Sequence, residues 1–221
     1  MLKNILSPHV TDHPNSKIVF LSGWGQRSNI LNLNDKFNGV EYLDYLPFSS
    51  IELTFSQLQL QNPDIIIGWS LGGQIAINAI LNNVITPKLL ILLATPFQFL
   101  SDNYYKIGVD PKIYNNFCDN LSKDPEKLLK RFHLMMLQGD KRFLEFKSKY
   151  FYHNNFNNLR YWLDYLVDFS AAKYDFSNFC KTELIYGKND KIVNYKQGQL
   201  FHKYIANSNF NVVDNYSHIL F

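Results

Sequence analysis

A serine flanked by glycines is the feature of this sequence that most directly indicates chemistry. The segment Gly68-Trp69-Ser70-Leu71-Gly72 has the pattern G-x-S-x-G, and it lies between an apolar run at 65–67 and a helix-like stretch at 74–81. In that setting the pattern is typical of a nucleophile elbow, a sharp turn that exposes the serine hydroxyl between a strand and a helix. Glycines suit positions 68 and 72 because a Cβ there would collide across so tight a turn. Ser70 is therefore the candidate nucleophile of a serine hydrolase.

Two later residues have the types needed to activate a serine. A serine hydroxyl is a weak nucleophile that needs a base to accept its proton and a third group to orient that base. In an α/β hydrolase these partners follow in the order Ser, acid, His, each after a later strand. Asp190 follows the expected strand at 182–186, and His218 follows the expected strand at 210–213. We therefore predict a Ser70-Asp190-His218 triad. The acids that compete with Asp190 are Asp164, Asp168 and Asp214. The histidines expected at the surface or in the helical segment are His13, His133, His153 and His202.

Donors for a developing oxyanion are predicted on two backbone amides. This fold uses the amide after the nucleophile and one from a loop after an early strand, which here are those of Leu71 and Trp24. Gly23 and Gly25 let the backbone turn so that the Trp24 amide points inward. The helix that begins at Leu71 directs its partial positive charge to the same place. The alternative for Trp24 is a plain core aromatic, whose amide could still serve.

The order of apolar runs predicts how these residues are positioned. Between several of the runs lie segments of helical length, which is the alternation expected of a parallel sheet. From 97 to 178 helical periodicity dominates. We therefore predict an α/β-hydrolase fold with a mostly parallel sheet flanked by helices, a core at 1–96 and 179–221, and an inserted helical lid at 97–178. The expected strands are 17–22, 64–67, 88–94, 182–186 and 210–213, with 39–46 as a weaker candidate.

Composition narrows the classes of function. The chain has 221 residues with 18 Phe, 14 Tyr and 3 Trp, enough for the core of a single domain. Its net charge of +3 does not indicate nucleic acid or membrane binding. Cys118 and Cys180 lack metal-type spacing, the N-terminus lacks the apolar region of a signal peptide, and no stretch reaches the ~20 apolar residues of a membrane span. We expect a cytoplasmic monomer.

The motifs together resemble one enzyme family. The segments that carry the resemblance are Leu21-Ser22-Gly23-Trp24-Gly25, Gly68-Trp69-Ser70-Leu71-Gly72-Gly73, Leu184-Ile185-Tyr186-Gly187 with Asp190 and Val193, and stretches within 130–138 and 159–168. They are similar to the pimeloyl-[acyl-carrier protein] methyl ester esterase family of biotin synthesis, over most of the chain. The resemblance implies cleavage of a methyl ester from pimeloyl-acyl carrier protein without a metal or cofactor. Ser70 would form the acyl-enzyme, His218 would move the proton, and the Trp24 and Leu71 amides would hold the oxyanion.

The charge of the expected lid fits an acidic carrier protein as partner. Between residues 127 and 160 there are eight basic and two acidic residues, a net charge of +6. Lys127 and Arg131 lie four residues apart, on one face of a helix. With Phe132 and Arg142 they are our candidates for binding the substrate and its carrier. The alternative is an ordinary solvated helix surface.

The chain also departs from the family pattern. Ser22-Gly23 replaces the usual His-Gly before the tryptophan, and Pro47-Phe48-Ser49-Ser50 replaces a glycine-rich loop. The sequence stops three residues after His218, where relatives carry a helix that fixes the histidine loop, so we expect His218 to be more mobile. Two other functions stay open: a general small-acyl carboxylesterase or thioesterase, and a non-catalytic binding protein with a hydrolase fold.

Overall fold

A single parallel sheet forms the centre of the molecule. The structure, a computed structural model, describes residues 15–30, 39–148, 152 and 157–220. Its six strands run in the order β2-β1-β3-β4-β5-β6, and every pair is parallel. The strands are β1 (Ile18–Leu21), β2 (Val40–Leu43), β3 (Ile65–Trp69), β4 (Leu89–Leu93), β5 (Lys181–Gly187) and β6 (Ser208–Val213).

The strands form where the apolar runs predict them. All residues of β1, β3 and β4 are buried, as expected for central strands covered on both faces. The weaker candidate at 39–46 is confirmed as β2, a strand at one edge of the sheet. In the register of β1 with β3, Leu21 pairs with Gly68, which brings the ends of these two strands to the same level. The predicted fold class is confirmed.

Helices cover the sheet between successive strands. The helix α3 (Leu71–Leu81) contacts β1, β3 and β4, and it buries eight of its eleven residues. The helix α8 (Lys196–Tyr204) contacts β5 and β6, whereas α2 (Ile51–Gln61) lies beside α3. Short 3-10 turns complete this part of the chain at η1 (Ser28–Ile30) and η3 (Ala171–Lys173).

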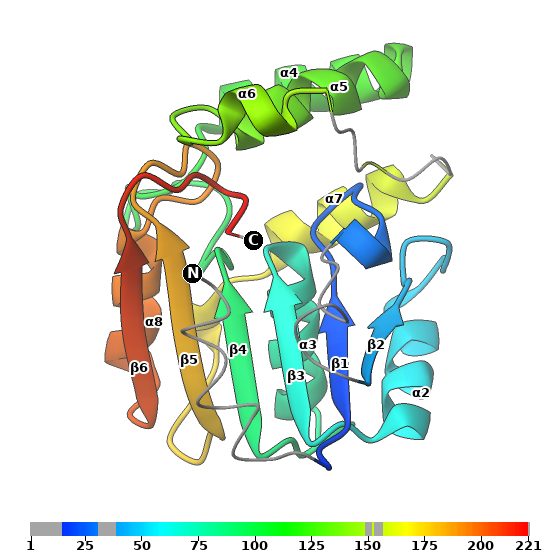
Figure 1. Ribbon diagram of the computed structural model, residues 1–221, viewed down its shortest axis with the longest axis vertical. Coiled ribbons are helices and arrows are strands. Elements are labelled where there is room, and N and C mark those ends of the chain that lie inside the picture. Colours follow the sequence, from blue (N-terminus) through cyan, green and yellow to red (C-terminus); the bar gives the residue numbers. More distant parts are fainter. Residues whose placement is uncertain (1–14, 31–38, 149–151, 153–156, 221) are drawn as a thin grey trace.

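The segment between β4 and β5 is helical, as predicted. It contains α4 (Pro111–Lys123), α5 (Pro125–Met136), α6 (Phe143–Phe146) and α7 (Leu159–Asp168). In Figure 1, α4, α5 and α6 lie beyond the carboxyl ends of the strands, where the predicted triad also lies. Proline in the first turn and an aspartate cap set the start of both α4 and α5. A role for these helices as a lid stays a prediction.

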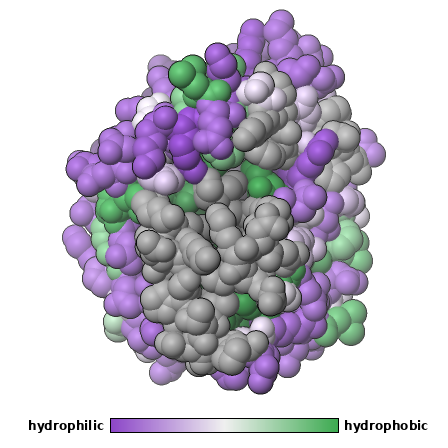
Figure 2. Space-filling view, in the orientation of Figure 1, coloured by the Kyte–Doolittle hydropathy of each residue, from purple (hydrophilic) through white to green (hydrophobic). Residues whose placement is uncertain are grey.

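The surface of these helices is mainly polar. The upper part of Figure 2, which corresponds to α4, α5 and α6 in Figure 1, is mostly hydrophilic with a few hydrophobic residues. Among the apolar residues of α4, α5 and α6, Leu144 is the most exposed, at 77%. Among the helices of the described ranges, none is long and apolar enough to cross a membrane.

Candidate active site

Ser70 lies at a strained turn between β3 and α3. Its φ of 54° and ψ of −117° lie in a region that residues other than glycine rarely adopt. The Ser70 amide donates to the Leu93 carbonyl at 2.8 Å, and the Gly73 amide donates to the Ser70 carbonyl at 3.0 Å. These bonds to the end of β4 and the start of α3 hold the serine in the conformation expected of a nucleophile elbow.

The neighbouring glycines are required by close backbone contacts. A Cβ on Gly68 would lie 2.4 Å from the Cα of Gly73, across the turn, as predicted. A Cβ on Gly72 would instead lie 2.3 Å from the Leu21 carbonyl oxygen, at the end of β1. Gly72 is therefore needed for the approach of α3 to β1, which the sequence pattern did not reveal.

Asp190 and His218 form a buried pair. The His218 Nδ1 and the Asp190 Oδ2 are 2.7 Å apart, and both side chains are at most 1% exposed. The other carboxylate oxygen accepts the amides of Ile192 at 2.7 Å and Val193 at 2.9 Å. Because Asp190 accepts through Oδ2, it fixes the tautomer of neutral His218 in which Nδ1 carries the proton and Nε2 is free to accept one.

The histidine loop lies against the residue that precedes the serine. The Trp69 indole donates to the His218 carbonyl at 3.0 Å, and the two rings are 5.4 Å apart. Within the described part of the chain, no hydrogen bond joins the Ser70 hydroxyl to the His218 ring. Such catalytic bonds are often long before the substrate is bound. The structure thus brings the three predicted residues to one edge of the sheet.

The loop that carries His218 is held by the residues that follow α5. The His218 amide donates to the Met136 carbonyl at 3.2 Å. The Ser217 amide and hydroxyl donate to Asp140 Oδ2 at 3.1 and 2.9 Å. Asn189, beside the predicted acid, donates to the Gly139 carbonyl at 2.8 Å. The loop of His218 therefore has several partners from one short segment, and the expected mobility of His218 stays a prediction.

Arg142 contacts the loop that carries His218 and is not an exposed surface residue. Its Nε and one Nη donate to the two oxygens of Asp140, each at 2.9 Å, and the same Nη donates to the Ile219 carbonyl. The guanidinium lies 4.2 Å from the centre of the Tyr216 ring. Burial raises the pKa of Asp140, but the hydrogen bonds from Arg142 and Ser217 outweigh it and hold that pKa below its ordinary value. The prediction of Arg142 as a carrier-binding residue therefore loses its basis, since its charge is already paired and only 14% of its side chain is exposed.

The two amides predicted as oxyanion donors are available. Within the described residues, neither the Trp24 nor the Leu71 amide donates a hydrogen bond to the protein. The Trp24 side chain packs as a core aromatic, the alternative considered from the sequence, and its indole donates to the Leu159 carbonyl at 2.8 Å. The positive φ of Gly25, 67°, provides the predicted turn after Trp24. Ser22 also fixes this loop, because its hydroxyl donates to the Gln26 carbonyl at 3.1 Å.

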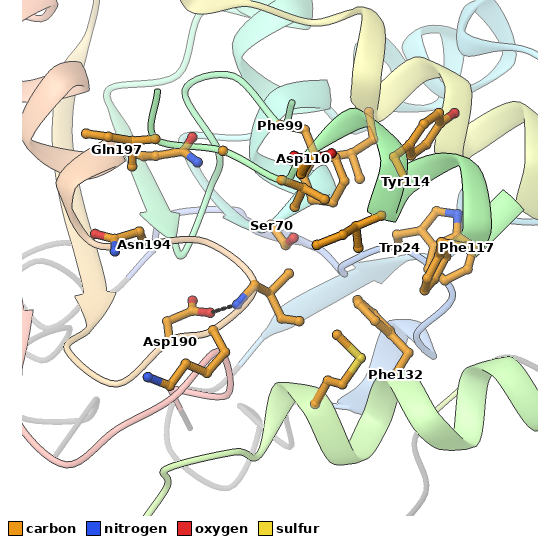
Figure 3. Close-up of a pocket in the computed structure, with 18 of the residues that line it drawn as sticks. Trp24, Ser70, Phe99, Asp110, Tyr114, Phe117, Phe132, Asp190, Asn194 and Gln197 are labelled. Atoms are coloured by element: carbon orange, nitrogen blue, oxygen red, sulfur yellow. Dashed lines mark hydrogen bonds between the residues drawn. The ribbon is translucent and has the colours of Figure 1, made fainter. Parts of the chain in front are cut away.

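Ser70 opens into a cavity of about 640 Å³. Figure 3 shows Ser70 between the aromatic side chains that belong to the helices and the polar side chains that follow β5. Phe132, a predicted substrate-binding residue, lines this cavity. Lys127 and Arg131 are exposed and are not part of the cavity lining.

The sequence analysis missed four lysines that line the cavity and overstated the positive charge of the helices. Lys106, Lys188, Lys191 and Lys196 all belong to the lining. Three of these lie within nine residues around Asp190. A count of basic residues close to the predicted acid would have found them. Within the predicted basic region, ion pairs join Lys130 to Glu126 at 2.7 Å and Arg160 to Asp164 at 2.8 Å, whereas Lys149 lies outside the described residues.

Several of the competing residues have partners elsewhere. Asp164 accepts from Tyr114 and Arg160, Asp214 pairs with Lys188, and His202 contacts Ser208. His133 is buried within the helices against the Phe146 carbonyl, and burial lowers its pKa. His13 and His153 lie outside the described residues. Where the chain is described, no group of His, Cys, Asp and Glu side chains could hold a metal ion, and Cys118 and Cys180 are free.

Curated relatives share similarity with part of the chain. The pimeloyl-[acyl-carrier protein] methyl ester esterase of Pseudoalteromonas atlantica is 30% identical over 138 residues, which are 55% of this chain and 53% of that protein. The enzyme of the same name from Vibrio vulnificus is 26% identical, with the same shares covered. The chain spans about half the length of these curated relatives. No protein-family model matches the sequence.

Solved structures of other proteins have a fold similar to that of this chain. An esterase from Exiguobacterium antarcticum aligns with a TM-score of 0.75 at 19% identity, over 91% of this chain and 84% of that one. A bromoperoxidase from Bacillus anthracis aligns with a TM-score of 0.74 at 15% identity, over 92% and 86% of the two chains. The chain therefore has the α/β-hydrolase fold and is similar to the pimeloyl-[acyl-carrier protein] methyl ester esterases.

Proposed function

We propose that this protein is a serine carboxylesterase that hydrolyses the methyl ester of pimeloyl-acyl carrier protein, a step of biotin synthesis. The observation that carries the proposal is the buried Asp190–His218 pair at 2.7 Å beside a serine held at a strained turn. Both Ser70 and Asp190 line one cavity. The names of the curated relatives support the choice of substrate.

The geometry supports a two-step reaction. His218 Nε2 accepts the Ser70 proton while the Ser70 oxygen attacks the ester carbonyl, and Asp190 stabilises the imidazolium. The Leu71 and Trp24 amides donate to the oxyanion of the tetrahedral intermediate. Collapse releases methanol, which takes the proton from His218, and leaves the acyl group on Ser70. A water molecule then attacks the acyl-enzyme with His218 as base, and the free carboxylate leaves.

The helices between β4 and β5 act as the lid in this proposal. The face of α5 that lines the cavity carries Phe132 and Met135, which would contact the acyl chain. Lys127 and Arg131 are exposed residues of the same helix outside the cavity lining, and neither forms an ion pair with a described residue. These two charges, without Arg142, are the ones we assign to an acidic carrier protein, where they would speed encounter more than strengthen binding.

The direct test is hydrolysis of pimeloyl-acyl carrier protein methyl ester by the purified chain, with Ser70→Ala as control. We expect the wild-type chain to convert the ester to the free acid, seen as a shift in gel mobility, and the variant to convert none. Absence of turnover by the wild-type chain contradicts the proposed substrate. Turnover by the Ser70→Ala variant contradicts the proposed nucleophile.

A general small-acyl carboxylesterase or thioesterase is the second candidate. It is favoured by the position of Lys127 and Arg131 outside the cavity lining, because an ester held in the cavity need not contact either residue. The double variant Lys127→Gln/Arg131→Gln distinguishes the two functions. A fall in kcat/KM for the carrier-bound ester, with no change for a free methyl ester, supports the carrier. Equal rates for both substrates in the wild-type chain support the general esterase.

A further inference from the structure

The cavity at Ser70 has two chemically different ends. Figure 3 shows them on opposite sides of the serine, with Trp24, Tyr114, Phe117 and Phe132 on one side and Asp190, Asn194 and Gln197 on the other. The first end is built by helices α4 and α5 and by the loop after β1, and it is apolar. The second end is built by the residues that follow β5 and by the start of α8, and it is polar.

Positive charge gathers in the lining of this cavity. The charged residues among those that line it are Lys106, Lys188, Lys191, Lys196, Asp110 and Asp190. The Asp190 carboxylate is fully occupied by His218 and by two backbone amides, and its side chain is not exposed. Asp110 caps α4, where it accepts the Lys112 amide at 2.7 Å. Among the described residues, neither acid forms an ion pair with a lysine of the lining.

Carboxylates lie near two of the four lysines: Lys106 interacts electrostatically with Asp102, and Lys188 forms an ion pair. Lys188 pairs with Asp214 at 2.8 Å. Lys191 and Lys196 are exposed, and within the described residues neither forms an ion pair. Lys196 is the first residue of α8, and its amide donates to Asn194 Oδ1 at 3.0 Å, which fixes the backbone that carries it.

The segment that carries Lys106 is held against α8. The Gln98 amide donates to the Gln197 Oε1 at 3.2 Å, and the hydroxyls of Tyr105 and Tyr204 are 2.9 Å apart. These contacts join the segment that carries Lys106 to both ends of α8, of which Lys196 is the first residue. The polar end is therefore formed by two chain segments with fixed backbones, rather than by lysines scattered over one loop.

We infer that this lysine-lined end binds an anionic group of the substrate, a carboxylate or a phosphate. The inference rests on the proposed esterase function, and it adds the class of molecule that the site selects. Clustered cations beside an apolar wall attract anions more strongly than isolated surface lysines do. A carboxylate would come from a free half-ester of a dicarboxylic acid, and a phosphate from the phosphopantetheine arm of a carrier protein.

Binding to the Ser70→Ala variant tests the inference without turnover. Two matched pairs of methyl esters differ only in the anionic group. The first pair is monomethyl and dimethyl pimelate. The second pair is monomethyl pimelate joined through a thioester to phosphopantetheine or to pantetheine. We expect calorimetry to show tighter binding, about fivefold or more, for the anionic member of one pair. Preference in the first pair identifies the carboxylate as the ligand, and preference in the second identifies the phosphate. Equal affinities within both pairs overturn the inference.

Lysine variants in the same background locate the site. We expect Lys191→Gln/Lys196→Gln to abolish the preference for the anionic ester. The matched control is Lys181→Gln/Lys203→Gln, which removes the same charge from exposed positions at the first residue of β5 and near the last residue of α8. Loss of the preference in the control as well would show a long-range charge effect and overturn the assignment. Hydrolysis by the wild-type chain is scored separately, so that a failure of the esterase proposal is distinguished from a failure of this site.

Discussion

Asp140 is the residue whose loss should most disturb the histidine loop. Its two carboxylate oxygens accept five hydrogen bonds, from the Arg142 amide, Nε and Nη and from the Ser217 amide and hydroxyl. The Asp140 side chain is not exposed, and that of Arg142 is 14% exposed. The substitution Asp140→Asn keeps the shape of the side chain but replaces one acceptor oxygen with an NH2 group. At least two of the five donors then face that NH2 group instead of an acceptor.

The expected loss follows from this geometry. Removing one charge of a buried pair costs about 3 kcal/mol or more, because the partner is left buried and unpaired. For a chain of this length, about 3 kcal/mol corresponds to a fall in Tm of about 6–12 °C. Displacement of the His218 loop should also lower kcat about tenfold below that Tm, since small misplacements of a catalytic group are costly.

The assay compares Asp140→Asn with Asp164→Asn. Asp164 also pairs with an arginine, at 2.8 Å, but both side chains are about half exposed, at 57% and 46%, and the pair lies in one helix. The control should lose less than about 1 kcal/mol. Thermal unfolding followed by circular dichroism gives the stability, and ester hydrolysis gives kcat. If both variants lose the same stability and Asp140→Asn keeps the wild-type kcat, the reasoning about the histidine loop is refuted.

Three further predictions follow from single contacts. Gly68→Ala should abolish esterase activity and lower Tm, because its Cβ would lie 2.4 Å from the Gly73 backbone; wild-type activity would contradict the elbow geometry. Trp24→Phe removes the hydrogen bond to the Leu159 carbonyl but keeps the amide, so it should cost about 1 kcal/mol in chemical denaturation and change kcat less than about threefold. Burial lowers the pKa of His133 in the folded chain. As the pH falls, His133 therefore takes up a proton in the unfolded chain before it does so in the folded chain, and stability should fall as the pH drops below about 6.5. In His133→Leu that fall in Tm should be smaller, and an unchanged pH profile would contradict it.

The strands, and the positions of Ser70, Asp190 and His218 at one edge of the sheet, could be predicted because their signals are local. Each central strand is a short apolar run, and Ser70, Asp190 and His218 each follow such a run in the order that the fold requires. Parallel strands then bring their carboxyl ends together without further information. The fold and the placement of the triad residues therefore needed only periodicity and order along the chain.

The remaining features depend on contacts between distant segments. Arg142 is one of eight basic residues in a helical region of the sequence, and only the structure shows that it contacts the loop that carries His218. The need for glycine at position 72 comes from the end of β1, which is about fifty residues away. Three of the cavity lysines lie close to Asp190 in the sequence, and only the placement of the 98–109 segment against α8 shows that Lys106 lines the same cavity.

The reactivity of Ser70 tests the proposed triad most directly. The chain is treated with a fluorophosphonate, digested and analysed by mass spectrometry, with His218→Ala and Asp190→Asn alongside. We expect one adduct on Ser70 in the wild-type chain, formed at least about a hundredfold more slowly in His218→Ala, because the serine then lacks its base. An unlabelled Ser70, or equal labelling rates in the wild-type chain and the His218 variant, would contradict a nucleophile activated by His218.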